Sequence, residues 1–311
     1  MGKNSRLTAR RSRKFKEKKN NPVFKFKIKK ILMTLLVVLT ALFFLALIYT
    51  NSHKRRIVVA FPQANSSDVA VLVFDPQNSN TNLVLIPTET LVSVSRNLGN
   101  WRLKSVWKLS LDEGVYGKLL SETIAKSFKF PVDSWSDTQI SGLVSGNIKE
   151  MIKSVFGSYR TNLDIFDKLN IFISLAFNRH LSLINLAKTQ ILDRSTLPDG
   201  EMGFSISNTM DDRIASIFSD PIFSTTNATV TIFNQSGYSS KAIGIGTMME
   251  VMGIKVIGNF TKDQADFNCI LQSGNEVFIK KMLSIVGCKA DFDTSLGKSD
   301  IRLYLGKNFV L

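Results

Sequence analysis

The pattern of apolar and polar positions separates one long apolar run from a later region of short alternating segments. Residues 31–50 contain no charged residue, glycine or proline. About 20 helical residues span the roughly 30 Å hydrocarbon core of a bilayer. The run is longer than the apolar part of a signal peptide, and basic residues 54–56 follow it instead of a small-residue cleavage site. It therefore predicts an uncleaved transmembrane helix.

After residue 56 the pattern becomes typical of β-strands. The segments 57–61, 68–74 and 83–87 are short and rich in β-branched residues, and a polar turn separates the last two. Such a pair of runs predicts a β-hairpin. Because successive residues in these runs are apolar, we expect helices to cover both faces of the sheet.

The region that follows has mainly helical spacing. Apolar residues at intervals of three and four predict helices at 117–128, 148–156, 163–177, 181–192 and 211–218. Ser136 or Asp137 is expected to cap a further helix, and the sequence Leu197–Gly200 predicts a turn. The second half of a domain at 57–220 is therefore predicted to be helical.

The last part of the chain alternates strands and helices. Strands are predicted at 228–233, 254–257, 266–271, 288–292 and 300–305. Helices are predicted from Ser239 or Ser240 to Met252 and from Asn275 to Val286, with Gly253 and Gly287 as their stops. This order predicts a small two-layer α/β domain at 228–308, with both helices on one face. The fold class is α/β.

The charges indicate how the chain is oriented in a membrane. Residues 1–30 hold 13 basic residues and one acidic residue, which accounts for +12 of the net charge of +15. The more basic flank of a transmembrane helix stays in the cytoplasm. We therefore expect a disordered cytoplasmic tail at 1–30, a transmembrane helix at 31–50, a single-pass topology and an extracytoplasmic C-terminal bulk. The basic tail suits anionic lipid better than nucleic acid, since nothing in it reads bases.

Cys269 and Cys288 are the only cysteines. Two isolated cysteines and two histidines do not predict a zinc site. Outside the cell the two cysteines could form a disulfide, or both could be small buried apolar residues. The sequence leaves these alternatives open.

Residues 228–308 resemble the C-terminal domain of LytR-type cell-envelope proteins. The resemblance rests on the strand 230–233, on Asn234 and Gly237 in a turn, on small residues in the next helix, on the strand 253–256 and on a final strand ending at Leu305-Gly306. Asn234 and Gly237 have turn chemistry. They also precede a helix N-terminus, where an anion or glycan could bind.

Residues 57–145 resemble the LytR–CpsA–Psr family. The matching features are Ser67-Asp68 before a strand, Asp75-Pro76, the Ile-Pro at 86–87, Lys104 and the segment 132–135. The resemblance implies an anchored domain that transfers a glycopolymer from a polyprenyl pyrophosphate to the cell wall with a divalent metal. The family has Arg-Asp-Thr after the Ile-Pro, whereas this chain has Thr88-Glu89-Thr90.

That departure bears directly on catalysis. A pyrophosphate leaving group needs its charge neutralised, which arginine does with a bidentate fork. Asp68 and Glu89 could still hold Mg²⁺ if the domain is active, and Lys104 is a candidate ligand-binding cation. The alternative is that both are strand-edge or turn carboxylates that face water. Without an arginine at position 88, we expect transfer to be weak and no cofactor to be required.

The sequence thus favours a binding or scaffolding role at the cell wall over efficient catalysis. The expected partners are the lipid bilayer and a cell-wall glycopolymer or polyprenyl-linked lipid. One alternative is an active phosphotransferase in which Arg96 or Arg102 reaches the phosphates. Another is an envelope-linked regulator of transcription that acts through the basic tail. The sequence does not specify the ligand or the oligomeric state.

Overall fold

The computed structural model describes residues 30, 33–40, 43, 56–64, 68–77, 80–177, 180–207, 211–297 and 300–310. The chain divides into two units, residues 1–50 and 51–311. In the first unit, Lys30, Met33–Thr40 and Phe43 are helical, and the rest of the predicted tail and span lies outside the described residues. Among the residues that the structure describes, no helix has the length and apolar character needed to cross a membrane.

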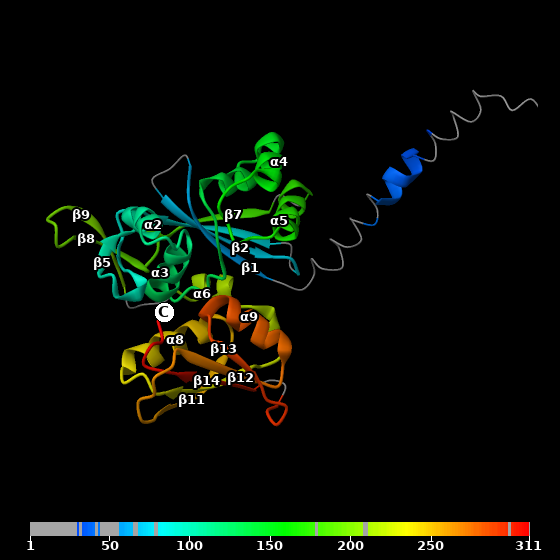
Figure 1. Cartoon of the computed structure of the whole chain (residues 1–311). Helices are drawn as coiled ribbons and strands as arrows, with labels where there is room; N and C mark the ends of the chain where they lie inside the picture. Colours follow the sequence, from blue (N-terminus) through cyan, green and yellow to red (C-terminus); the bar gives the residue numbers. More distant parts are fainter. Residues whose placement is uncertain are drawn as a thin grey trace, which may run out of the picture. The chain divides into compact units, whose positions relative to one another are not determined.

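The first sheet of the second unit has the strand order β6-β1-β2-β3-β7 (Figure 1). Its centre is antiparallel and contains β1 (Ile57–Pro62), β2 (Asp68–Asp75) and β3 (Asn80–Pro87). The edge strands β6 (Ser134–Trp135) and β7 (Leu181–Asn185) run parallel to their neighbours. The predicted hairpin of β2 and β3 is confirmed, with Asp68 opposite Pro87.

Helices cover both faces of this sheet, as the continuous apolar runs predict. On one face, α2 (Leu103–Asp112) and α3 (Lys118–Phe128) pack against alternate strand residues such as Val58 and Ala60. On the other face, the 3-10 segment η2 (Thr138–Val144), α4 (Ile148–Phe156) and α5 (Ile165–Phe177) pack against the intervening residues, such as Val59. The period of two in a strand sends neighbouring side chains into separate cores.

The prediction of a helix at 181–192 is wrong. Residues 181–185 form β7, which pairs in parallel with β3, and a short 3-10 turn, η3 (Leu186–Lys188), follows. Next come the hairpin strands β8 (Leu192–Thr196) and β9 (Met202–Ile206), which meet at the predicted turn. Two short helices follow, α6 (Asp212–Phe218) and α7 (Pro221–Ser224). The second half of this region is therefore mixed, not simply helical.

The second sheet has the strand order β11-β10-β14-β12-β13. Its elements are β10 (Thr229–Asn234), α8 (Ser239–Val251), β11 (Lys255–Thr261), β12 (Cys269–Ser273), α9 (Glu276–Val286), β13 (Lys289–Phe292) and β14 (Asp300–Leu305). Both helices pack on the face that carries Val230, Leu271 and Leu303, as the two-layer prediction requires. Gly253 and Gly287 have φ values of 87° and 64° and follow the two helices, where a side chain would be strained.

A disulfide joins Cys269 of β12 to Cys288, the residue before β13. The two sulfurs are 2.08 Å apart, and 19 residues separate the cysteines in the sequence. The bridge therefore ties the edge strand β13 to its parallel neighbour β12.

Buried charges link the two sheets. The ammonium of Lys281 on α9 donates to Asp133 at 2.6 Å and to the carbonyl of Arg56 at 2.6 Å, and lies 3.6 Å from Asp220. The other oxygen of Asp133 accepts from the amide of Val58 on β1. The Arg56 side chain donates to the carbonyl of Ser219, and burial lowers its pKa. This network fixes α9 against the first sheet.

Candidate functional site

The structure places the predicted site residues in two separate regions. Asp68 begins β2, Glu89 lies in the turn after β3, and Lys104 is in the first turn of α2. Asn234 is the last residue of β10 in the second sheet, and Gly237 lies in the turn that follows. The Asn234 side chain accepts from the amide and hydroxyl of Ser236 and donates to the carbonyl of Tyr238. Its amide group is thus used inside the turn.

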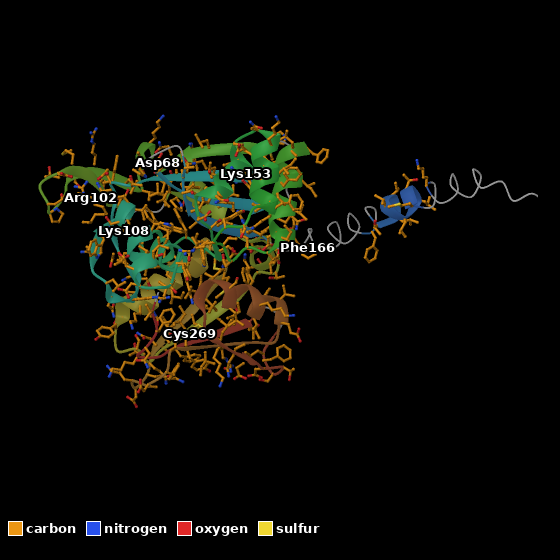
Figure 2. The ribbon with its side chains drawn as sticks, turned by 45° about the horizontal axis from the view of Figure 1, so that its top comes forward. Asp68, Arg102, Lys108, Lys153, Phe166 and Cys269 are labelled. Carbon is orange, nitrogen blue, oxygen red and sulfur yellow. A yellow bond between two sulfur atoms is a disulfide. The ribbon has the colours of Figure 1, made fainter. Side chains whose placement is uncertain are left out.

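Glu89 and Lys104 meet in a charged cluster around Arg102, the residue labelled in Figure 2. The Arg102 guanidinium forms a two-pronged contact with Asp199, at 2.9 and 2.8 Å, and a third contact with Glu201 at 3.1 Å. It also donates to Glu89, whose other oxygen accepts from Lys104 at 3.0 Å. The hairpin of β8 and β9 supplies Asp199, so the cluster connects segments that are far apart in sequence.

The cluster holds its carboxylates ionised. The hydrogen bond from Lys104, followed by that from Arg102, lowers the pKa of Glu89. The hydrogen bond from Arg102 likewise lowers the pKa of Asp199, and these carboxylates raise the pKa of Arg102. Hydrogen bonds between charged groups are stronger than neutral ones, and a bidentate arginine–carboxylate pair makes two of them. The sequence did not identify Asp199 and Glu201 as partners of Arg102. The local pattern predicts the turn between β8 and β9 in which they lie, but not its contact with a distant arginine.

This arrangement does not fit a pyrophosphate or metal site. The fork of Arg102 is filled by carboxylates, and three acidic groups outnumber the two basic groups around it. Glu89 is engaged by two cations instead of being open to Mg²⁺. Among the described residues, no group of three or more His, Cys, Asp or Glu side chains could hold a metal ion. No metal-dependent step follows from this geometry.

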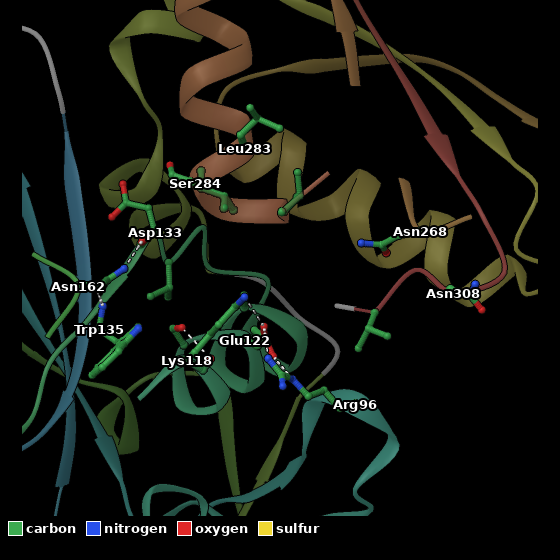
Figure 3. A pocket seen from close by; sticks show the side chains of 17 residues that line it. Arg96, Lys118, Glu122, Asp133, Trp135, Asn162, Asn268, Leu283, Ser284 and Asn308 are labelled. Atoms are coloured by element: carbon green, nitrogen blue, oxygen red, sulfur yellow. Dashed lines mark hydrogen bonds and ion pairs between the residues drawn. The ribbon is translucent and has the colours of Figure 1, made fainter. Parts of the chain in front are cut away.

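A cleft of about 610 Å³ lies between α3 and the end of α9 (Figure 3). We call it the α3–α9 cleft. One side of the cleft is formed by α3, β6 and Asn162, and the other by α9, Asn268 and the residues after β14. Its polar and aromatic lining consists of Arg96, Lys118, Ser121, Glu122, Asp133, Trp135, Asn162, Asn268, Ser284 and Asn308.

The cleft is close to neutral. Arg96 binds both oxygens of Glu122, at 2.8 and 2.9 Å, and this pairing raises the pKa of Arg96. Lys118 lies 3.9 Å from the same carboxylate. Asp133, at the cleft wall, is paired with buried Lys281. Arg96 has a φ of 60°, a conformation that costs a non-glycine residue free energy and is concentrated at functional sites.

Trp135 supplies an aromatic wall. Its ring stacks on Tyr116 with centroids 6.4 Å apart, and Arg160 lies over the Tyr116 ring at 4.7 Å. A Cβ at Gly117 would lie 2.4 Å from the indole, so glycine permits this close approach. A tryptophan beside asparagine amides, a carboxylate and a guanidinium offers an apolar surface together with hydrogen-bond donors and acceptors. That combination matches a sugar ring.

Comparison with known proteins gives structural neighbours only. No family model matches the chain, and no curated protein matches it. Among solved structures, TagT of B. subtilis is 14% identical, with 50% of this chain and 86% of that chain covered and a TM-score of 0.36. TagV of B. subtilis is 10% identical, with 65% and 99% covered and a TM-score of 0.38.

Another neighbour is described as a LytR-CPS2A-psr family protein, YwtF (TagT), with bound octaprenyl pyrophosphate lipid. It is 15% identical, with 50% of this chain and 85% of that chain covered and a TM-score of 0.35. The structural neighbours are thus LytR–CpsA–Psr proteins. TM-scores this low do not establish a shared fold by themselves.

Proposed function

We propose that this chain is a single-pass cell-envelope protein that binds a cell-wall glycan in the α3–α9 cleft without transferring it. Residues 31–50 are the anchor, with the N-terminus in the cytoplasm and the bulk of the chain outside. The uncharged apolar run, the basic flank before it and the resemblance to LytR-type proteins support this topology.

The proposal that the chain does not catalyse transfer rests on Arg102, whose guanidinium is already bonded to carboxylates. Arginine stabilises a departing pyrophosphate only when its donors are directed at the phosphate oxygens. Here Glu89, Asp199 and Glu201 take those donors, and position 88 is threonine. A phosphate that displaced these carboxylates from Arg102 would lie near three negative charges.

The lining of the cleft supports an uncharged glycan as the ligand. Three asparagines line the cleft, Asn162, Asn268 and Asn308. The Asn162 side chain already accepts from the Trp135 amide and donates to the Asp133 carbonyl, and Asn308 already donates to Asp266. The remaining donor and acceptor positions of these amides can bond sugar hydroxyls. Trp135 covers the apolar face of a ring, and the paired Arg96 and Glu122 leave little net charge. A volume of about 610 Å³ is of the size that small ligands occupy.

Catalysis is tested with the full-length chain in detergent, supplied with a polyprenyl-pyrophosphate-linked glycopolymer, an acceptor wall fragment and Mg²⁺. We expect no transfer of glycopolymer. Robust turnover that is lost in Asp68→Asn or Glu89→Gln would establish the transferase alternative instead.

Binding is tested with purified peptidoglycan from which charged polymers have been stripped. Trp135→Ala should weaken binding about thirty-fold or more, because removing a central tryptophan from a binding site costs about 2 kcal/mol or more. Trp101→Ala is the matched control, since Trp101 is exposed on β5 (Asn100–Arg102) and lies outside the cleft. Equal binding by wild type and Trp135→Ala would rule out the cleft as the glycan site.

The topology is tested with a tag fused after Leu311. In intact cells we expect external protease to remove the tag. A protected tag would contradict the proposed orientation.

A further inference from the structure

Helix α4 has one broad apolar stripe, and the core covers only part of it. Met151 and Val155 are buried against the first sheet. Ile148, Ile152 and Phe156, spaced four residues apart, form the outer edge of this stripe and are 51%, 46% and 70% exposed. In a surface helix of a globular protein, the whole stripe normally faces the core. The exposed edge of the stripe on α4 therefore calls for a partner other than the core.

Neighbouring elements also expose apolar side chains. Ile165, Phe166 and Phe177 of α5 and Leu183 of β7 are also exposed. Beside Ile148 lies an apolar pit of about 200 Å³, with Met151, Leu175 and Leu181 among its walls. We call the exposed residues of α4, α5 and β7 named here the α4–α5 surface; Figure 2 labels Phe166 and Lys153 on its two helices.

Lysines border the stripe on one side. Lys149 and Lys153 each follow a stripe residue directly, which places them about 100° further around the helix, and both are exposed. A helix with an apolar face bordered by lysines is suited to binding in the plane of a membrane surface. Its apolar side chains enter the acyl boundary, and its ammonium groups reach the headgroups. The charge and the apolar pattern thus point to phospholipid.

The position of the stripe relative to the chain entry agrees with this partner. The fold begins at Ile57, which lies in the same core as Met151 of α4 and Ile171 of α5. Six residue steps separate Thr50, the end of the apolar run, from Arg56. Those steps span at most about 21 Å when fully extended. The fold therefore begins within that reach of the end of the apolar run.

We propose that the α4–α5 surface docks on the outer lipid surface of the bilayer in which the chain is anchored, with the pit accepting the end of an acyl chain. This inference rests on the proposed anchor but not on glycan binding. Docking fixes the folded unit against the membrane and leaves helices α2 and α3, on the opposite face of the sheet, turned away from it.

The test places an environment-sensitive dye on full-length chain reconstituted in phosphatidylcholine–phosphatidylglycerol vesicles. The dye is attached at Ile152→Cys or, in a second protein, at Phe156→Cys, without reductant so that the native disulfide stays intact. Lys108→Cys, exposed on α2, is the control position. We expect nitroxide-labelled lipid to quench the dye at residues 152 and 156 several-fold more than the dye at residue 108.

A substitution then tests the stripe itself. In the Ile152→Cys protein, Phe156→Asp should abolish most of the quenching while the chain still floats with the vesicles. Val277→Asp, which changes an equally exposed apolar residue on α9, should leave the quenching unchanged.

Three other outcomes would overturn the docking. Flotation with no quenching at residues 152 and 156, or with equal quenching at residue 108, removes docking and leaves the anchor intact. A dye shift without quenching, together with cross-linked dimers, assigns the surface to a second copy of the chain. Failure of the chain to float removes the anchor and the docking together, whereas loss of glycan binding alone affects neither.

Discussion

At the scale of single residues, Arg102 determines how the first charged cluster responds to acid. Lys104 and Arg102 lower the pKa of Glu89, and Arg102 lowers the pKa of Asp199. The folded protein therefore keeps these carboxylates ionised at a pH where the unfolded chain protonates them. Their contribution to stability is complete above an unfolded-state pKa of about 4 and disappears as the pH falls through the lower folded-state values.

Arg102→Met should consequently lower the melting temperature near neutral pH and reduce its further fall between about pH 5 and about pH 2. Thermal unfolding of full-length chain in detergent, followed across this range, measures the effect. Arg213→Met, at an exposed position on α6, is the control and should keep the wild-type slope. Identical slopes for Arg102→Met and wild type would contradict the assigned pairing.

The partners of Arg102 also show what sequence reasoning can reach at this scale. Asp199 is 97 residues away from Arg102, so no local pattern connects the two. By contrast, the turn chemistry of Asn234 and Gly237 was predicted, since it depends only on neighbouring residues. Arg96 was considered as a phosphate ligand, but it pairs with Glu122 in the α3–α9 cleft.

At the scale of elements, the predictions succeeded where local signals are strong. Asn275 begins α9 and Gly287 ends it, as their residue types predict. Leu181, Leu183, Ile184 and Leu186 have the spacing of a helix, yet Leu181–Asn185 is a strand. This segment is a strand because it pairs with β3. Since β7 lies at the edge of the sheet, its residues are exposed or half-buried and do not show the alternation of buried and exposed positions that identifies a strand. The sheet order and the α3–α9 cleft could not be predicted, because they arise from contacts between distant segments.

The cap of α9 provides a prediction at this scale. The Asn275 side chain accepts from the amides of Val277 at 2.9 Å and Phe278 at 3.4 Å. Asn275→Ala should lower the free energy of unfolding by about 1 kcal/mol, because these amides lose their acceptor. Asn275→Asp, which keeps the acceptor, should retain most of the stability. Urea unfolding of the three proteins tests this, and a similar loss in both variants would argue against the cap.

At the scale of the whole molecule, the described part of residues 51–311 contains two five-stranded sheets with separate cores, which buried charges connect. Lys281 is the centre of that connection, because it reaches Asp133 beside the first sheet and the carbonyl of Arg56 at its edge. The α3–α9 cleft lies between the same elements. Glycan binding is therefore expected to depend on how α9 is held.

Lys281→Met should lower the free energy of unfolding by about 3–5 kcal/mol, since it leaves Asp133 buried without its cation. Lys280→Met is the matched control: Lys280 is the preceding residue, is exposed and pairs only at the surface with Glu276, so its loss should cost about 0.5 kcal/mol or less. Chemical unfolding measures both values. Comparable losses would show that the buried network does not stabilise the junction.

The oxidation state of Cys269 and Cys288 would indicate on which side of the membrane the second sheet lies. The sequence has two cysteines, so a molecule exposed to the oxidising exterior would present no reactive sulfur, whereas one facing the cytosol would be kept reduced. Lysing cells directly into a mass-tagged maleimide should leave the chain unmodified until a reductant is added. Immediate modification would place the second sheet on the inner side of the membrane without any fused tag.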